Sequence, residues 1–356
     1  MTRMCRVVGT LVAVAALSTL AVACKSGVAG KQPRVLRVPS AIATIADAVS
    51  KAKPGDIVLV APGTYHESVK IYRPGITVRG EDRNTVILDG QDTLANGFLV
   101  GANDVAIENL TVHSYTQNGV VFSGIEAVTK GQGADPNVVY GVDDNVLQGY
   151  RVSYVTSYNN GLYGIYAFAS RGGVVEHSYV SGHPDSGLYI GQCKPCDVVM
   201  HDMTVEYNSI GYYGTNSSGG VYVINSVFRH NRLGIAPNSQ KAEKLSPQGE
   251  TVVAGNLVAD NVDASAPEIV QGYAGGGIAI GGGSRNTVLR NRVINNPTFG
   301  IMVTSLNDFA PTNNRVEGNV LEGNGVDLGY SPAGASDAGG NCFTGNTFVT
   351  SLPDSI

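Results

Sequence analysis

The chain has no tryptophan, and Lys, Arg, Asp and Glu together make up only 15% of its 356 residues. Beyond about residue 60, no stretch has the apolar periodicity of a long amphipathic helix, which argues against a helical bundle. Methionine is scarce, and two of the five, Met1 and Met4, lie at the extreme N-terminus, so a methionine-based metal site is not favoured. Glycine is abundant instead, with 46 residues, which indicates many tight turns between short strands.

Basic residues are outnumbered, with 24 Lys and Arg against 29 Asp and Glu. Removal of an N-terminal signal that carries Arg3 and Arg6 leaves 22 − 29 = −7. Such a chain is a poor candidate for binding nucleic acid. It also repels polyanions unless a local basic cluster or a bound cation intervenes.

Residues 1–23 are predicted to be a signal peptide, because an apolar run from Val7 to Ala23 follows Arg3 and Arg6. The run ends in small residues directly before Cys24, which resembles a lipobox with Cys24 as the lipidated residue. Residues 24–33 would then be a linker to a lipid anchor, the protein's only membrane attachment. An ordinary signal peptide and a secreted product are the alternative.

Three cysteines remain after this segment. In an exported protein the pair Cys193 and Cys196 is most simply a small-loop disulfide. A metal site that joins the pair to His201 is the alternative, and neither a thioredoxin-like motif nor any other metal site is predicted.

Glycine followed by alternating apolar residues recurs about every 22 to 25 residues. The anchors are Gly97, Gly119, Gly164, Gly187, Gly211, Gly234, Gly277, Gly300 and Gly325. Two intervals are longer and contain inserted loops, at residues 125–148 and at 239–250 and 262–275. Repeats of this length, each with two or three short strands, indicate a solenoid.

The repeat resembles that of the pectin-lyase-like superfamily from residue 34 to about 350. The resemblance predicts an all-β, single-stranded, right-handed parallel β-helix of about 10 coils over residues 34–356. Residues Ala43–Ala52 read as a short helix, and the segment 40–55 is predicted to cap the first coil, whose edge would otherwise be exposed. Capped solenoids of this kind are commonly monomeric.

Strand alternation gives the residues after each anchor a direction. The first is nearly always aliphatic and points inward, so the second points outward. On three successive coils this outward residue is tyrosine, at Tyr166, Tyr189 and Tyr213. An exposed strip of tyrosines suits the apolar faces of sugar rings, and a stacked ladder that only stabilises the solenoid is the alternative.

Four residues before three of the anchors stand His183, Tyr207 and His230, which are predicted to share one turn position on consecutive coils. Asp185 and Arg232 occupy a neighbouring position, and Glu206 lies one coil from Arg229. Long loops extend the turn on either side of these coils. Together these residues define the predicted site, although a turn histidine is often only a hydrogen-bonding residue.

The resulting hypothesis is an extracytoplasmic protein that binds and modifies a polysaccharide or cell-envelope glycan. A lyase or epimerase acting on a uronate needs a base and a cation, for which His183 or Tyr207 and Arg232 or Lys244 are the candidates. A hydrolase would need two carboxylates, Asp185 and Glu206. No motif demands a cofactor, and Ca²⁺ is left open. A non-catalytic glycan-binding β-helix is the second hypothesis. The third is a structural or metal-handling β-helix, similar to periplasmic copper-associated relatives, for which clusters of Met or His would be expected.

Overall fold

The computed structural model of the chain describes residues 32–125, 146–241, 244–262, 265–267, 274–332 and 338–356. The chain divides into two units, Met1–Pro33 and Arg34–Ile356. The predicted signal peptide, Cys24 and most of the linker lie outside the described residues, as do parts of all three inserted loops. Among the residues described, no helix is both long enough and apolar enough to span a membrane.

Three parallel sheets make up the second unit. The first sheet contains β1 (Val35–Val38), β2 (Ile57–Val60), β5 (Thr77–Gly80), β8 (Val105–Glu108), β11 (Leu147–Ser153), β14 (Ser170–Glu176), β17 (Val198–His201), β20 (Ser218–Ile224), β23 (Gly249–Ala254), β26 (Thr287–Leu289), β29 (Arg315–Glu317) and β32 (Cys342–Thr344). The second contains β3 (Gly63–Tyr65), β6 (Val86–Asp89), β9 (Thr111–His113), β12 (Thr156–Tyr158), β15 (Tyr179–Ser181), β18 (Thr204–Glu206), β21 (Val227–Arg229), β24 (Leu257–Ala259), β27 (Arg292–Ile294) and β30 (Val320–Glu322). The third contains β4 (Val69–Ile71), β7 (Asn96–Val100), β10 (Asn118–Ser123), β13 (Tyr163–Phe168), β16 (Ser186–Gly191), β19 (Ile210–Thr215), β22 (Leu233–Asn238), β25 (Gly276–Gly281), β28 (Phe299–Thr304), β31 (Leu328–Ser331) and β33 (Ser351–Leu352).

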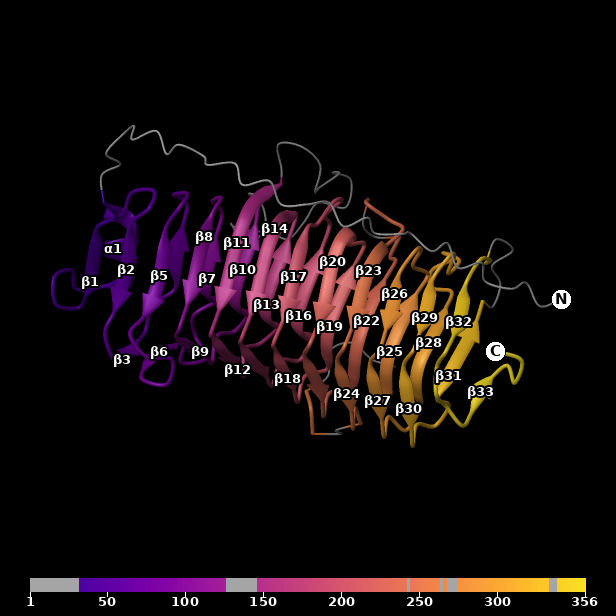
Figure 1. Cartoon of the computed structure of the whole chain (residues 1–356). Coiled ribbons are helices and arrows are strands. Elements are labelled where there is room, and N and C mark those ends of the chain that lie inside the picture. The colour runs from indigo at the N-terminus through magenta and orange to yellow at the C-terminus, as the bar shows by residue number, and fades with distance from the viewer. Residues whose placement is uncertain (1–31, 126–145, 242–243, 263–264, 268–273, 333–337) are drawn as a thin grey trace, which may run out of the picture. The chain divides into compact units, whose positions relative to one another are not determined.

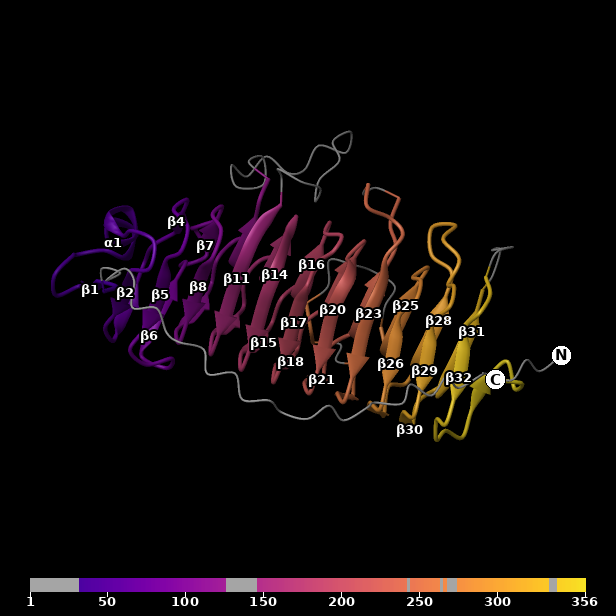
Figure 2. The ribbon, with the colours of Figure 1, turned by 45° about the horizontal axis from the view of Figure 1, so that its top comes forward.

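Each coil contributes one strand to the first, second and third sheet in turn, and the next coil repeats the path (Figure 1). The same view turned by 45° shows the strands of successive coils side by side along the solenoid (Figure 2). Since the second sheet has 10 strands in the described residues, the chain forms ten complete coils. The predicted all-β parallel β-helix of about ten coils is therefore confirmed.

The short helix α1 (Ile45–Lys51) lies at the N-terminal end of the stack (Figure 1). Thr44 caps it, because its hydroxyl accepts a hydrogen bond from the Asp47 amide at 3.0 Å. The Glu67 carboxylate accepts two more amides of the first turn, from Ile45 at 3.0 Å and Ala46 at 2.9 Å. The helix buries Ile45, Ala48 and Val49 against the first coil, as the predicted cap requires.

Steric crowding explains the repeated glycines. A Cβ on Gly164 would lie 2.3 Å from a methyl carbon of Val180 and 2.7 Å from the carbonyl oxygen of the next anchor, Gly187. Any larger residue would therefore push successive coils apart. Gly325 is an exception to the predicted series, because Ile301 pairs with Leu328 and the residue opposite Gly300 is Asp327.

Side-chain amides stack inside the turns. In the turn between the second and third sheets, each member of one column of residues (one residue per coil) hydrogen-bonds to the member on the next coil. This ladder comprises Asn160, His183, Asn208, Asn231, Asn261, Asn296 and Asn324. Asn291 belongs to a similar ladder between the first and second sheets. Asn109 and Asn225 lie on the outer side of that turn instead, with φ of 55° and 46°.

Asn231→Ala should destabilise the solenoid. Its amide nitrogen donates to Val205 O at 3.0 Å and Asn261 Oδ1 at 3.1 Å, and its oxygen accepts from Asn208 at 3.0 Å. Because each buried group left unpaired costs about 1–3 kcal/mol, we expect the free energy of unfolding in urea to fall by about 2 kcal/mol or more. The exposed Asn84→Ala is the control, with an expected change within about 0.5 kcal/mol. Equal effects of the two variants would contradict a stabilising role for the ladder.

Candidate functional site

The predicted tyrosine column exists, but it is not an open strip. Tyr166 pairs with Tyr189, and Tyr189 with Tyr213, on three adjacent strands of the third sheet. The rings of Tyr166 and Tyr189 stack at 4.9 Å, and those of Tyr189 and Tyr213 meet edge to face at 6.1 Å. Tyr166 is half-buried, whereas Tyr189 and Tyr213 are only 5% and 8% exposed. The expectation of solvent exposure is thus wrong for two of the three.

Neighbouring side chains cover these rings. The tyrosines pack in one apolar cluster with Ile125, Phe168, Ile210, Leu233 and Ala236 on the outer face of the third sheet. Strand alternation predicts the side of the sheet to which a residue points, but not which other groups pack over it. The alternative of a self-packing ladder is therefore the better description of Tyr189 and Tyr213.

The position of His183 differs most from the predicted site. Its side chain is fully buried in the amide ladder and does not share the outer position of Tyr207 and His230. Asn160 Nδ2 lies 3.1 Å from Nε2, and Asn208 Oδ1 lies 2.8 Å from Nδ1. Asn160 Oδ1 and Asn208 Oδ1 each accept a backbone amide, from Tyr115 and from His183 itself, which fixes both amide orientations.

It follows that Nε2 of His183 accepts and Nδ1 carries the proton. Burial lowers the pKa of this imidazole to about 4, although the hydrogen bond to Asn208 acts in the opposite direction. Both nitrogens are occupied and no substrate can reach them. His183 is therefore a ladder residue in place of asparagine, and the prediction that it is a catalytic base is wrong.

Tyr207 and His230 do lie together on the outside of the turn. Their rings stack at 5.3 Å, and both residues have positive φ, 59° and 53°. Glu206 pairs with Arg229 as predicted, and Arg229 Nε donates to its carboxylate at 2.6 Å. The other Glu206 oxygen accepts the Tyr179 hydroxyl at 2.9 Å, so this carboxylate is held in a structural network.

Asp185 lies one residue before β16, beside the tyrosine cluster. Its Oδ2 accepts the Tyr163 hydroxyl at 2.8 Å, and among the described residues its buried Oδ1 has no hydrogen-bond partner. Burial raises the pKa of this carboxyl to about 6, although the Tyr163 bond lowers it. Arg232 lies in the same column two coils on, where its Nε donates to Ala266 O at 2.9 Å. Lys244 is exposed in the loop that follows β22.

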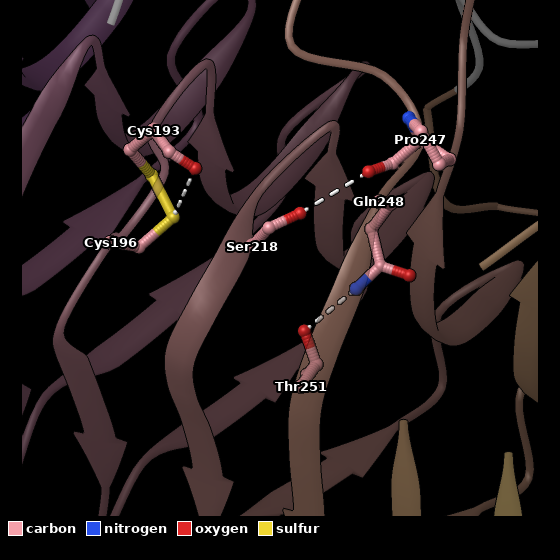
Figure 3. The surroundings of a disulfide bond; sticks show 6 residues. All are labelled: Cys193, Cys196, Ser218, Pro247, Gln248 and Thr251. Carbon is pink, nitrogen blue, oxygen red and sulfur yellow. Dashed lines mark hydrogen bonds between the residues drawn. A yellow bond between two sulfur atoms is a disulfide. The ribbon is translucent and has the colours of Figure 1, made fainter. Parts of the chain in front are cut away.

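Cys193 and Cys196 are joined by a disulfide in the turn between β16 and β17 (Figure 3). The next coils stack on it, since the Ser218 amide donates to Cys193 O at 3.0 Å and the Ser218 hydroxyl to Pro247 O at 3.3 Å. Both cysteines are fully buried. The disulfide leaves no thiolate for a metal ion, so the alternative Cys–His201 metal site is wrong.

A different cluster lies at the C-terminal ends of two neighbouring strands of the first sheet. Glu176 is the last residue of β14, His201 is the last residue of β17, and the two are register partners. His177 and Asp202 follow them, with φ of 48° and 54°. One ligand atom each from Glu176, His177 and His201 lies within 4.8 Å of the others. We call these three residues, with Asp202, the histidine–carboxylate cluster.

Hydrogen bonds orient the cluster. His201 Nε2 lies 3.1 Å from Glu176 Oε2, while its Nδ1 lies 2.6 Å from Asp202 Oδ2. The Tyr154 ring stacks on His177 at 4.7 Å. Side-chain exposures of 12% for Glu176, 25% for His201 and 37% for His177 leave the cluster open to solvent on one side.

The electrostatic surroundings keep both carboxylates ionised. Burial raises the pKa of Glu176, but the Ser153 hydroxyl, Arg151 and His201 outweigh burial and the net pKa lies below its ordinary value. The hydrogen bond from His201, aided by Asn225, lowers the pKa of Asp202. Two imidazoles and ionised carboxylates are the ligands that transition-metal ions take in proteins, so these residues fit such an ion.

No prediction from the sequence named this cluster, although the sequence contains a signal of it. The pairs Glu176-His177 and His201-Asp202 are one coil apart, and the coil spacing places them side by side. In the sequence His201 stands near Cys193 and Cys196, which favoured a link to the cysteines. The signal for the cluster is that each of its histidines lies one repeat from a carboxylate or imidazole of the other pair.

Fold and site together define a parallel β-helix protein with a candidate metal centre. The family model described as periplasmic copper-binding protein (NosD) matches residues 144–352, more than half of the chain and all of the histidine–carboxylate cluster. The chain belongs to the NosD family. In a comparison with curated proteins, no sequence matches.

Solved structures share the fold at low sequence identity. Pectate lyase Pel9A is 14% identical with a TM-score of 0.53, and the alignment covers 92% of this chain and 81% of that one. The A-module of the Azotobacter vinelandii mannuronan C-5 epimerase AlgE6 is 13% identical with a TM-score of 0.50, over 86% of this chain and 93% of that one. At such identities the likeness shows the fold alone, and it agrees with the predicted parallel β-helix.

Acid should destabilise the protein through His183. Because burial holds the folded-state pKa near 4, below its ordinary value of about 6.5, the unfolded chain binds a proton first as the pH falls. Stability from this residue is therefore complete above about pH 6.5 and falls by about 3 kcal/mol towards pH 4. In His183→Asn, urea unfolding at pH 7 and pH 4.5 should differ less than in the parent chain.

The matched control is His230→Asn, which removes an imidazole from the outer side of the turn two coils on. It should leave the parent chain's acid sensitivity unchanged. An unaltered acid sensitivity in His183→Asn would show that another group is responsible.

Proposed function

We propose that this protein binds a transition-metal ion such as copper through Glu176, His177 and His201, on the outside of an exported β-helix. The observation that carries the proposal is the convergence of three ligand atoms from two successive coils within 4.8 Å. Three protein ligands leave coordination positions open for water or an exchanging ligand. An ion held in this way can be taken up and passed on.

Several features support this assignment. His201 Nδ1 lies 2.6 Å from the Asp202 carboxylate, so Nε2 is the nitrogen that faces Glu176 and would bind the ion. Arg151 and the Ser153 hydroxyl, the latter at 3.0 Å, hold the other oxygen of Glu176. Outer partners of this kind orient metal ligands in proteins. The family's description as periplasmic and copper-binding agrees with both the site and the expected export.

The N-terminal segment supplies the proposed location. Residues 1–23 are proposed to direct export and Cys24 to carry a lipid, with the β-helix held as a monomer at the extracytoplasmic face. The secreted form is the alternative. Metabolic labelling with a fatty acid, compared between the parent chain and Cys24→Ala, separates the two.

Metal binding should depend on the cluster. In the parent chain, copper at about 100 times its Kd should raise the free energy of unfolding by about 2.7 kcal/mol. His201→Ala should abolish most of this stabilisation, because it removes the ligand at the centre of the group. Equilibrium dialysis should show one copper ion per chain for the parent and none for the variant.

His230→Ala is the control, since it removes an imidazole that lies outside the cluster. Copper binding should survive in it. Retention of one tightly bound ion in His201→Ala would contradict the assignment of the site.

A second function, glycan binding with lyase or epimerase activity, is favoured by Asp185. Its half-buried carboxyl, with a pKa raised to about 6, is an acid–base group beside the half-exposed Tyr166, and Arg232 and Lys244 are the proposed cations. Tyr207 remains the alternative base. Hydrolysis is disfavoured, because Glu206 is tied to Arg229 and Tyr179. Within the described residues, no carboxylate cluster for Ca²⁺ accompanies this surface.

Asp185→Asn tests this second function. A panel of uronate polymers is incubated with the chain, and unsaturated ends are followed by ultraviolet absorbance. If ionised Asp185 acts as the base, the rate should fall as the pH drops below about 6 and should vanish in the variant. Asp260→Asn, which alters a turn aspartate elsewhere, should not change the rate. An inert panel together with unaltered affinity electrophoresis in Tyr166→Ala would reject a glycan site here.

A further inference from the structure

The sulfur atoms of the chain are turned away from the histidine–carboxylate cluster. In the sequence, Met200 and Met203 flank His201 and Asp202, as though thioethers and imidazole formed one metal motif. In the structure, however, both methionine side chains lie in the solenoid core, with exposures of 0% and 2%. For Met200 strand alternation is the reason, because an outward His201 in β17 requires an inward Met200.

The remaining sulfurs do not reach the cluster either. Cys193 and Cys196 are bonded to each other, Cys342 lies in β32 at the far end of the first sheet, and Met302 lies on the third sheet. Among the described residues, the donor atoms around His201 are therefore nitrogen and oxygen only. Thioether and thiolate ligands select Cu⁺, whereas imidazole and carboxylate ligands suit divalent ions.

Charge points the same way. One carboxylate, from Glu176, lies beside Nε2 of His201, and another, from Asp202, lies beside Nδ1. Arg151 neutralises only part of this negative charge. The Coulomb attraction of such a group for a divalent ion is twice that for a monovalent ion at the same distance. Of the divalent first-row ions, Cu²⁺ binds nitrogen and oxygen sites most strongly.

We infer that the cluster is specific for the oxidised ion, Cu²⁺, and holds Cu⁺ weakly. The inference rests on the proposed metal-binding function and goes beyond it by naming the oxidation state. One consequence concerns release. When an external one-electron reductant such as ascorbate reduces bound Cu²⁺, the ascorbate is oxidised by one electron. The product Cu⁺ is held by ligands that suit it poorly, so its coordination bonds to the protein break and the ion leaves, while the covalent bonds of the protein stay unchanged.

The test compares both ions on the purified chain. Cu²⁺ is titrated in air, and Cu⁺ is titrated without oxygen in the presence of ascorbate and a Cu⁺-specific chelator. Cu²⁺ should bind more tightly by about tenfold or more. Its electron paramagnetic resonance spectrum should show nitrogen coupling from two imidazoles.

Two variants sharpen the comparison. Glu176→Met replaces the carboxylate by a thioether, and it should weaken Cu²⁺ binding while strengthening Cu⁺ binding. Asp202→Gly removes the carboxylate behind His201 at a backbone position, φ of 54°, that glycine adopts without cost. It should weaken Cu²⁺ binding about 10- to 100-fold and change Cu⁺ binding less.

Met203→Leu is the matched control, because it removes a buried thioether and conserves volume. It should leave the affinity for both ions unchanged. Tighter binding of Cu⁺ than of Cu²⁺ to the parent chain, or a loss of Cu⁺ binding in Met203→Leu, would overturn the inference and leave the metal site standing. Binding of neither ion would overturn the metal site itself.

Discussion

The stacking of each coil in register on the one before it is the constraint on which this structure depends. Backbone hydrogen bonds between parallel strands set the spacing, and side-chain amides in the turns keep successive coils in register. A buried amide can donate to one neighbour and accept from the other, so a column of asparagines satisfies itself along its whole length. Glycine anchors such as Gly164 allow the coils to approach closely enough for this to happen.

The same constraint creates the candidate metal centre. When coils stack in register, residues one coil apart become neighbours. A functional site on the solenoid is therefore built from columns of residues, one residue per coil. Inside the turns the columns are nearly uniform. Outside, they are free to vary, and at one place Glu176, His177, His201 and Asp202 bring imidazoles and carboxylates together. Positive φ at His177 and Asp202 turns the chain there and places both side chains on the outer side.

His183 shows how one turn separates structure from chemistry. It lies one coil from Tyr207 in the sequence pattern, yet it belongs to the inner column, where burial keeps it neutral. Tyr207 and His230 occupy the outer column one residue earlier in the turn. A shift of a single residue therefore changes a candidate base into a part of the scaffold.

Periodicity predicted a repeat solenoid, because glycine spacing and alternating apolar residues reflect local and nearest-neighbour contacts. The superfamily resemblance then predicted the β-helix and its number of coils, and the helical segment 43–52 predicted the cap. Periodicity was also enough to predict the side of the sheet on which Tyr166, Tyr189 and Tyr213 lie. Only the tertiary structure decided that Tyr189 and Tyr213 are covered, that His183 is buried, and that Glu176 and His201 meet. These facts depend on which side chains pack over a column and on single-residue shifts within turns, and no repeat length carries that information.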